Sequence, residues 1–170
     1  EIPLVKQSRK ERLKSKKLKT PDKPIHYDGS SRSVLTESLR ILTTNMDFLK
    51  DAGTKCQVVT LTSFGESAGK SFVVANIAAC IADAKKTVVM IDLDLRKRTL
   101  SRRFGHLHKE VGASHYLYDP ELKIDAVIKK DVAPGIDLIP AGMVPPNPVE
   151  LLKRERFDQM INELRTRYDY

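Results

Sequence analysis

The apolar positions of this sequence change their spacing along the chain, and the changes predict an alternation of helices and strands. From Ser33 to Lys50 the apolar residues recur every three or four positions, which predicts a helix capped by Ser33. The β-branched run Cys56–Ser63 predicts a strand, and the alanine-rich stretch Lys70–Ala84 predicts a second helix. Thr87–Asp92 is apolar without alternation, as expected for a parallel strand that is covered on both faces.

The C-terminal third of the chain continues this order with a weaker strand and another helix. The strand is expected at Ile136–Pro140, and a proline-rich loop follows it. Asn147 and Glu150 resemble a capping box around the first turn of the next helix, where Pro148 is favourable. Strand, loop, helix and strand together make a βαβ unit. The sequence therefore predicts an α/β fold with a mostly parallel sheet flanked by helices.

A loop rich in glycine and serine lies between the first predicted strand and the helix after it. Its sequence, TSFGESAGKSF, has the strand–loop–helix context of a phosphate-binding P-loop, where backbone N–H groups and the helix N-terminus attract phosphate oxygens. Lys70 would reach the β- and γ-phosphates of ATP, and the Ser71 hydroxyl would bind Mg²⁺. The match is imperfect because Phe64 stands where the motif has its first glycine, and a structural turn with an incidental lysine is the alternative. The residues expected to bind the nucleotide are Gly65, Glu66, Ser67, Ala68, Gly69, Lys70, Ser71 and Phe72.

Two carboxylates, Asp92 and Asp94, come at the end of the second predicted strand. Ligands of open α/β sheets bind at the carboxyl ends of strands, so both carboxylates are expected beside the phosphates, on one side of an extended chain. One would orient Mg²⁺ and the other would accept a proton from an attacking hydroxyl. We expect Lys70, Asp92 and Asp94 to be catalytic and Ser71, Asp92 and Asp94 to surround the metal. Ordinary strand-end carboxylates are the alternative.

Positive charge is concentrated in two parts of the chain, whose formal net charge is +8. Residues 1–24 form a basic arm that is rich in Lys and Arg and is closed by prolines. The arm is compatible with a solubilising tail, a segment on an anionic membrane surface or a nucleic-acid-binding arm. The second cluster is typical of a solvated face but equally suits an acidic partner or a neighbouring subunit; its members are Arg96, Lys97, Arg98, Arg102 and Arg103.

Other features limit the compartment and the metal chemistry. No apolar run approaches the roughly 18 residues of a membrane span, and the basic first residues do not resemble a signal peptide. Cys56 and Cys80 are far apart in apolar surroundings, as expected for small buried side chains in a reducing compartment. The four histidines lack the spacing of zinc ligands. These features together favour a cytoplasmic location.

Three motifs resemble those of the bacterial tyrosine kinases (BY-kinases), a family that regulates capsule and exopolysaccharide export. SFGESAGKS and VVMIDLDLRK are similar to the Walker A and Walker A′ motifs of this branch of the P-loop (MinD-like) ATPase superfamily, and IPAGMVPPNPVELL is similar to its proline-rich loop. TESLRILTTN, residues 36–45, resembles the E-x-x-R-x-x-R helix through which these kinases form rings. Glu37 and Arg40 match that helix, but Thr43 occupies its second arginine position, which counts against assembly by this route.

The resemblance implies an ATP-dependent protein-tyrosine autokinase that phosphorylates neighbouring copies of itself, with Asp92 as the base and Asp94 supporting the metal. It implies a homo-oligomeric ring, the polysaccharide export and polymerisation machinery and a cognate phosphatase as partners. The basic arm would lie on the anionic inner face of the bacterial plasma membrane, and nucleic acid is not expected. Residues 25–170 would be the N-terminal part of a P-loop kinase domain, truncated before the Walker B strand and the tyrosine cluster. Tyr168 and Tyr170 would then be structural.

Two alternatives to the kinase remain open. A MinD/ParA-like positioning ATPase has an additional lysine early in its phosphate loop, whereas Phe64, Gly65 and Glu66 stand there in this chain. A catalytically weak, nucleotide-dependent assembly module is compatible with the altered ring helix.

Overall fold

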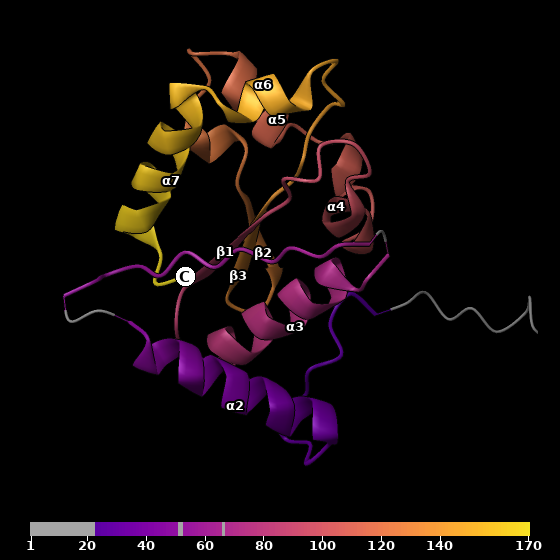
Figure 1. Ribbon diagram of the computed structural model, residues 1–170, viewed down its shortest axis with the longest axis vertical. Coiled ribbons are helices and arrows are strands. Elements are labelled where there is room, and N and C mark those ends of the chain that lie inside the picture. Colours follow the sequence, from indigo (N-terminus) through magenta and orange to yellow (C-terminus); the bar gives the residue numbers. More distant parts are fainter. Residues whose placement is uncertain (1–22, 51–52, 66) are drawn as a thin grey trace, which may run out of the picture.

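The computed structural model describes residues 23–50, 53–65 and 67–170, and these residues surround a three-stranded mixed sheet (Figure 1). The strands are β1 (Val88–Ile91), β2 (Lys129–Ala133) and β3 (Ile136–Ile139), in the order β1-β3-β2. β1 and β3 run parallel, and β2 and β3 run antiparallel with an irregularity in their register. The predicted α/β class is confirmed, although the sheet is parallel only between β1 and β3. The basic arm up to residue 22, and Glu66 of the phosphate loop, lie outside the described residues.

Helices cover the sheet on both faces (Figure 1). One face carries α3 (Lys70–Asp83), with α2 (Val34–Phe48) packed on its outer side, and the other carries α5 (Ala113–Tyr118), α6 (Pro148–Leu152) and α7 (Glu155–Arg167). The short helix α4 (Thr99–Arg103) packs against α3, and two single-turn helices, η1 (Leu107–Lys109) and η2 (Ile124–Ala126), lie in the connections. No helix among the described residues is both long and apolar enough to cross a membrane.

The helix ends follow the local signals of the sequence in most places. The Ser33 side chain accepts a hydrogen bond from the Thr36 N–H and so caps α2 as predicted. α3 begins at Lys70, directly after Gly69 in the left-handed conformation. α6 begins at Pro148 with Asn147 at its N-cap, but the Asn147 side chain makes no capping bond, so the predicted capping box is wrong. The helix predicted after Asn147 is also divided in two, because α6 ends at Leu152 and α7 follows it.

Two apolar clusters, one on each face of the sheet, hold these layers together. The cluster towards α2 and α3 contains Ile77, Met90 and Leu138, and the cluster towards α5, α6 and α7 contains Ile139 and Met160. Each fully buried aliphatic side chain contributes roughly 1.5–3 kcal/mol of transfer free energy. Both cysteines are buried free thiols, as the sequence predicted. β3 is buried at all four residues, and it therefore forms the centre of the sheet.

The segment Cys56–Ser63 is not a strand, and this prediction is wrong. The Gln57 N–H donates to the carbonyl of Asp169 at 2.9 Å, but the segment forms no ladder with another strand of the described chain. Asp169 and Tyr170 in turn bond to the edge of β1, where the Tyr170 carbonyl accepts from the Val89 N–H at 3.0 Å. Asp169 and Tyr170 thus bridge the apolar segment and β1, and both of these segments line a cavity.

Candidate functional site

The phosphate loop joins the Cys56–Ser63 segment to α3, and two of its residues have positive φ angles. Gly69 has φ 86° and an ideal Cβ there would meet nothing within 4 Å, so the glycine is required by the backbone conformation and not by crowding. Ser67 has φ 57°. The first bond of α3 runs from the Val73 N–H to the Gly69 carbonyl at 3.0 Å. The N–H groups of the first helical turn therefore have no helical acceptor and point out of the helix end, as an anion requires.

Lys70 is the first residue of α3, and this half-buried lysine directs its ammonium to the loop before the helix. The Lys70 Nζ donates to the Ser63 Oγ at 2.9 Å, and the Ser63 Oγ donates to the Gly65 carbonyl at 2.9 Å. Both contacts join the ends of the loop through a neutral hydroxyl. Because the ammonium is held by a hydroxyl and not by a carboxylate, its charge is available to a phosphate. The residues present thus fit the nucleotide that the motif predicts.

Asp92 follows β1 and is held in place by α4. The side chain is only 3 % exposed; its Oδ2 accepts from the Ser101 N–H at 2.7 Å and from the Ser101 hydroxyl at 2.6 Å. Its Oδ1 accepts from the Asp94 N–H at 3.2 Å. Burial raises the pKa of Asp92 above its ordinary value, and the bonds from Ser101 oppose that effect.

Ser101 is a site residue that the sequence did not suggest. It is fully buried, and its hydroxyl also accepts from the Ala141 N–H at 3.0 Å, so it connects Asp92 to the loop that leaves β3. A single serine in a basic stretch has no pattern that would distinguish it. Only the folded arrangement identifies its contact with Asp92.

Asp94 lies in a different environment from Asp92. β1 ends at Ile91, so the two carboxylates do not share the face of one extended strand as predicted. Asp94 is exposed, its Oδ1 accepts from the Lys97 N–H at 3.0 Å, and its carbonyl accepts from the Arg98 N–H at 2.8 Å. Asp94 therefore begins the turn that leads into α4.

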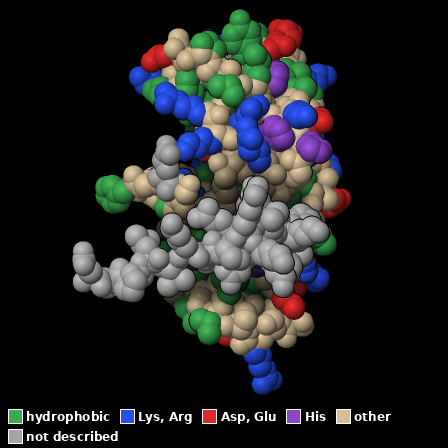
Figure 2. Space-filling view, turned by 90° about the vertical axis from the view of Figure 1, so that its right-hand side faces the viewer, with side chains coloured by type: hydrophobic (Ala, Val, Ile, Leu, Met, Phe, Trp, Pro, Cys, Tyr) green, Lys and Arg blue, Asp and Glu red, His purple; other side chains and the backbone are tan. Residues whose placement is uncertain are grey.

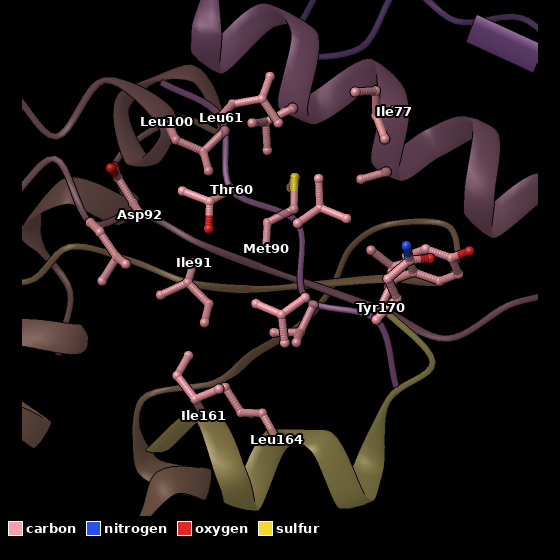
Figure 3. A pocket seen from close by; sticks show the side chains of 18 of the residues that line it. Thr60, Leu61, Ile77, Met90, Ile91, Asp92, Leu100, Ile161, Leu164 and Tyr170 are labelled. Carbon is pink, nitrogen blue, oxygen red and sulfur yellow. The ribbon is translucent and has the colours of Figure 1, made fainter. Parts of the chain in front are cut away.

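A cavity of about 970 Å³ brings four of the predicted residues together (Figure 3). Lys70, Ser71, Asp92 and Asp94 all line it. Figure 3 shows Asp92 at one end and Tyr170 at the other, with Ile77 of α3 above and Ile161 of α7 below. The wall of the cavity is otherwise mostly apolar, with Asp158, Asn162 and Arg165 of α7 as further polar lining residues.

Other predicted residues lie outside this cavity. The Phe72 ring is 5.3 Å from the His26 ring and 5.2 Å from the Arg103 guanidinium, so its contacts join the segment around His26 to α3 and α4. Gly65, Ser67, Ala68 and Gly69 do not line the cavity, and their described feature is the loop backbone.

The candidate metal ligands do not form a complete metal centre. Among the described residues, no group of three or more His, Cys, Asp or Glu side chains is placed to hold a metal ion. Mg²⁺ usually takes one or two carboxylates and completes its shell with phosphates and water. Exposed Asp94 and the Ser71 hydroxyl fit such a nucleotide-dependent site. The Asp92 Oδ2 accepts two hydrogen bonds, whereas the Oδ1 accepts one and keeps a lone pair for a further contact.

The two residues of the predicted ring contact pair with each other on α2. The Arg40 Nη1 donates to the Glu37 Oε1 at 3.1 Å, and the Arg40 Nη2 donates to the Gly29 carbonyl. The Thr43 Oγ1 lies 3.4 Å from the Cys80 Sγ and thus faces α3. Within one chain, the opposite charges of Glu37 and Arg40 therefore neutralise each other on this helix.

Comparison with known proteins places this geometry in a family. The model of the CobQ/CobB/MinD/ParA nucleotide binding domain matches residues 59–169. The tyrosine-protein kinase wzc of Salmonella typhi is 35% identical over 146 residues, which are 83% of this chain and 19% of that protein. The tyrosine-protein kinase etk of Escherichia coli strain K12 is 35% identical over 133 residues, 78% of this chain and 18% of that protein. The chain thus spans about a fifth of the length of these relatives.

Solved kinase domains show the same similarity in three dimensions. The kinase domain of Escherichia coli tyrosine kinase ETK superposes with a TM-score of 0.71 at 34% identity, covering 78% of this chain and 51% of that one. The BceF tyrosine kinase domain gives a TM-score of 0.72 at 32% identity, and the match covers 98% of this chain and 66% of that one. The VpsO kinase domain gives a TM-score of 0.64 at 30% identity, and the match covers 81% of this chain and 70% of that one.

Proposed function

We propose a protein-tyrosine autokinase activity for this chain, which belongs to the bacterial tyrosine kinase (BY-kinase) family of CobQ/CobB/MinD/ParA nucleotide-binding domains. The reaction transfers the γ-phosphoryl group of ATP to a tyrosine hydroxyl of another copy. The observation that carries the proposal is the meeting of Lys70, Ser71, Asp92 and Asp94 at one end of a single cavity.

Each residue has a role that follows from its position. The loop N–H groups and the Lys70 ammonium stabilise charge on the phosphates, which is the main requirement of phosphoryl transfer. Mg²⁺, when bound, neutralises phosphate charge, and Ser71 and Asp94 are the groups that would hold it. Asp92 accepts the proton of the attacking hydroxyl, and Ser101 fixes its orientation.

The test of this function is the accumulation of phosphotyrosine on the purified protein with ATP and Mg²⁺. We expect the variant Asp92→Asn to lose at least about 100-fold in transfer rate with a much smaller change in ATP affinity, because a base acts mainly in the transition state. Nucleotide binding and thermal unfolding are measured on the same samples. ATP hydrolysis without phosphotyrosine would instead support a MinD/ParA-like positioning ATPase, and binding without either reaction would support an assembly module.

We further propose that the apolar part of the cavity receives one more strand of the kinase domain, the Walker B strand of the family, beside β1. The Val89 N–H already bonds to the Tyr170 carbonyl, and strand alternation directs the Ile91 N–H to the same edge. Side chains of α3 and α7, including Ile77 and Ile161, face the gap from both sides. A parallel strand there would be covered on both faces.

Two neighbouring residues of α7 test this arrangement. Met160 is fully buried, so Met160→Ala should lower the free energy of unfolding of the present chain by about 2–5 kcal/mol. Ile161 is only partly buried and lines the cavity, so Ile161→Ala should cost less, about 1 kcal/mol, because only part of the side chain packs against the apolar cluster. Chemical denaturation of both variants measures the difference. Equal losses would mean that the cavity is closed by collapse in solution and that no strand is needed to fill it.

The binding partners and the location of this protein are proposed from its membership of the family. We propose self-association of the kinase, a role in capsule or exopolysaccharide export with its polymerisation machinery, and reversal by a cognate phosphatase. The location proposed is the cytoplasmic side of the plasma membrane, with the basic arm of residues 1–24 on the anionic lipid surface.

A further inference from the structure

Of the five tyrosines in the chain, all of which lie in described residues, one has a freely exposed side chain. Tyr118 is 73 % exposed, whereas Tyr116, two residues earlier on the same helix, is 2 % exposed. The hydroxyls of the other three donate to the carboxylates of Asp83, Asp137 and Asp47, and these three are Tyr27, Tyr168 and Tyr170. Tyr118 is thus the tyrosine whose ring already lies at the surface, and its hydroxyl bonds to no carboxylate in the described part of the chain.

The sequence around Tyr118 is acidic. Tyr118 is the last residue of α5, and exposed Asp119 and Glu121 follow it. The Asp119 Oδ1 accepts from the Glu121 N–H at 2.9 Å, which turns the chain back at this point. α5, which ends at Tyr118, lies on the opposite face of the sheet from α3, which begins at Lys70 (Figure 1).

The mouth of the candidate site has the opposite charge. Residues 95–109 (LRKRTLSRRFGHLHK) contain six Lys and Arg and no Asp or Glu. We call their exposed members the α4 basic surface, which consists of Arg96, Lys97, Arg102 and Lys109. Figure 2 shows Lys and Arg side chains gathered with histidines on this face.

Three arginines of this segment bond to backbone carbonyls, and no ion pair with a carboxylate is seen for them among the described residues. The Arg102 Nε donates to the Lys97 carbonyl, and the guanidiniums of Arg98 and Arg103 donate to carbonyls of His108 and Pro24. The segment also touches both catalytic carboxylates, through Ser101 on Asp92 and through the Lys97 N–H on Asp94. The basic segment therefore lies directly beside the two carboxylates of the candidate site.

We propose that Tyr118 is a phosphorylation site of this chain, modified by a neighbouring copy whose α4 basic surface holds the acidic residues Asp119 and Glu121. The inference rests on the proposed kinase function. The Tyr118 Oη forms a bond to the γ-phosphorus, and the bond between that phosphorus and the β–γ bridging oxygen breaks. ADP leaves with the electron pair of the broken bond, and the phenolic proton passes to Asp92. The product phosphotyrosine lies beside Arg154, whose guanidinium is 5.8 Å from the Tyr118 ring centroid.

The acceptor role is tested by mixing two forms of the chain. Lys70→Met serves as an acceptor that cannot phosphorylate itself, with Tyr118 intact or changed to Phe, and an active chain carrying a different mass label serves as the kinase. Mass spectrometry should find phosphate on Tyr118 of the acceptor, and Tyr118→Phe should lower its total incorporation at least fivefold. Phosphotyrosine elsewhere in the chain with none at Tyr118 would overturn the inference while leaving the kinase function intact.

Docking is tested without any turnover. A fluorescent peptide of residues 116–122 (YLYDPEL) is compared with its twin carrying Asp119→Asn and Glu121→Gln, by anisotropy against the chain at several salt concentrations. We expect the acidic peptide to bind roughly tenfold more tightly, with a preference that fades as salt screens the charges. The triple variant Arg96→Gln, Arg102→Gln, Lys109→Gln should abolish the preference.

A control with the same change in net charge separates local from general electrostatics. Lys85→Gln, Lys123→Gln and Lys153→Gln remove three exposed cations elsewhere and should leave peptide binding unchanged. Equal binding of both peptides, or loss of ATP affinity in place of peptide affinity in the first triple variant, would overturn the assignment of the α4 basic surface. Anionic vesicles or duplex DNA that displace the acidic peptide would do the same. If the peptide binds as expected but no phosphotyrosine ever forms, the docking surface stands, and the acceptor role falls together with the kinase function.

Discussion

Replacement of Lys70 by Met should reduce phosphotyrosine formation by at least about 100-fold and leave the fold unchanged. The Lys70 ammonium contacts Ser63 at the mouth of the phosphate loop and takes no part in the apolar clusters, so its removal opens no cavity in the core. The charge it would place on the β- and γ-phosphates is one of the few fixed positive groups of the site. A loss of 100-fold corresponds to about 2.7 kcal/mol of transition-state stabilisation, the range measured for a single electrostatic contact of this kind.

The matched control is Lys85→Met, which removes a lysine just beyond the other end of α3. We expect that variant to keep its activity. Thermal unfolding and nucleotide binding are recorded for both proteins, so that a loss of activity can be separated from a loss of structure. Undiminished phosphotyrosine in Lys70→Met would show that Lys70 does not act on the phosphates.

The elements that the sequence predicted well are those whose signals are local. α3 follows from a glycine that permits a left-handed turn, from a lysine and from an apolar helical run, all within one segment, and the structure begins this helix at Lys70 as expected. α2 follows from a capping serine and helical spacing. β1 is apolar on both faces because helices cover both faces, and its continuous pattern predicted that.

The element predicted wrongly depends on a partner that is distant in sequence. Cys56–Ser63 has the composition of a strand, but a strand forms only when an adjacent strand accepts its N–H groups. In the described chain its neighbour is the short end at Asp169 and Tyr170, followed by the cavity. Composition reported the preference of the segment correctly, and pairing, which composition cannot report, decided its structure.

The candidate site likewise contains residues that local motifs identify and surroundings that only the packing of distant segments decides. Lys70, Ser71, Asp92 and Asp94 could be named from their motifs, and the structure places them around one cavity. Their surroundings could not be named, because Ser101 reaches Asp92 only through the packing of α4 against the end of β1. The exposure of Tyr118 likewise depends on which side of a short helix faces the core, and a six-residue helix carries too little periodicity to predict it.

Gly112→Ala should lower the free energy of unfolding by about 3–5 kcal/mol or more, the largest stability effect expected for one added methyl group in this chain. An ideal Cβ at Gly112 would lie 2.0 Å from the Pro140 carbonyl oxygen and 2.7 Å from the Gly142 nitrogen. Both neighbours are backbone atoms, so a change of rotamer cannot relieve the overlap. The backbone at Gly112 is extended, and the requirement for glycine is therefore close approach and not conformation.

The same substitution should also lower activity, because this contact supports the site. The Ala113 and Ser114 N–H groups donate to the carbonyls of Pro140 and Ala141, at 2.7 and 2.9 Å, so α5 is bonded directly to the loop that leaves β3. The Ala141 N–H in turn donates to Ser101, which holds Asp92. Gly105→Ala is the control: Gly105 has φ 86° with nothing within 4 Å of its ideal Cβ, so the change should cost only the strain of a left-handed alanine, about 1 kcal/mol. Urea denaturation compares the two, and a Gly112→Ala protein as stable as Gly105→Ala would show that α5 does not pack closely on the loop that leaves β3.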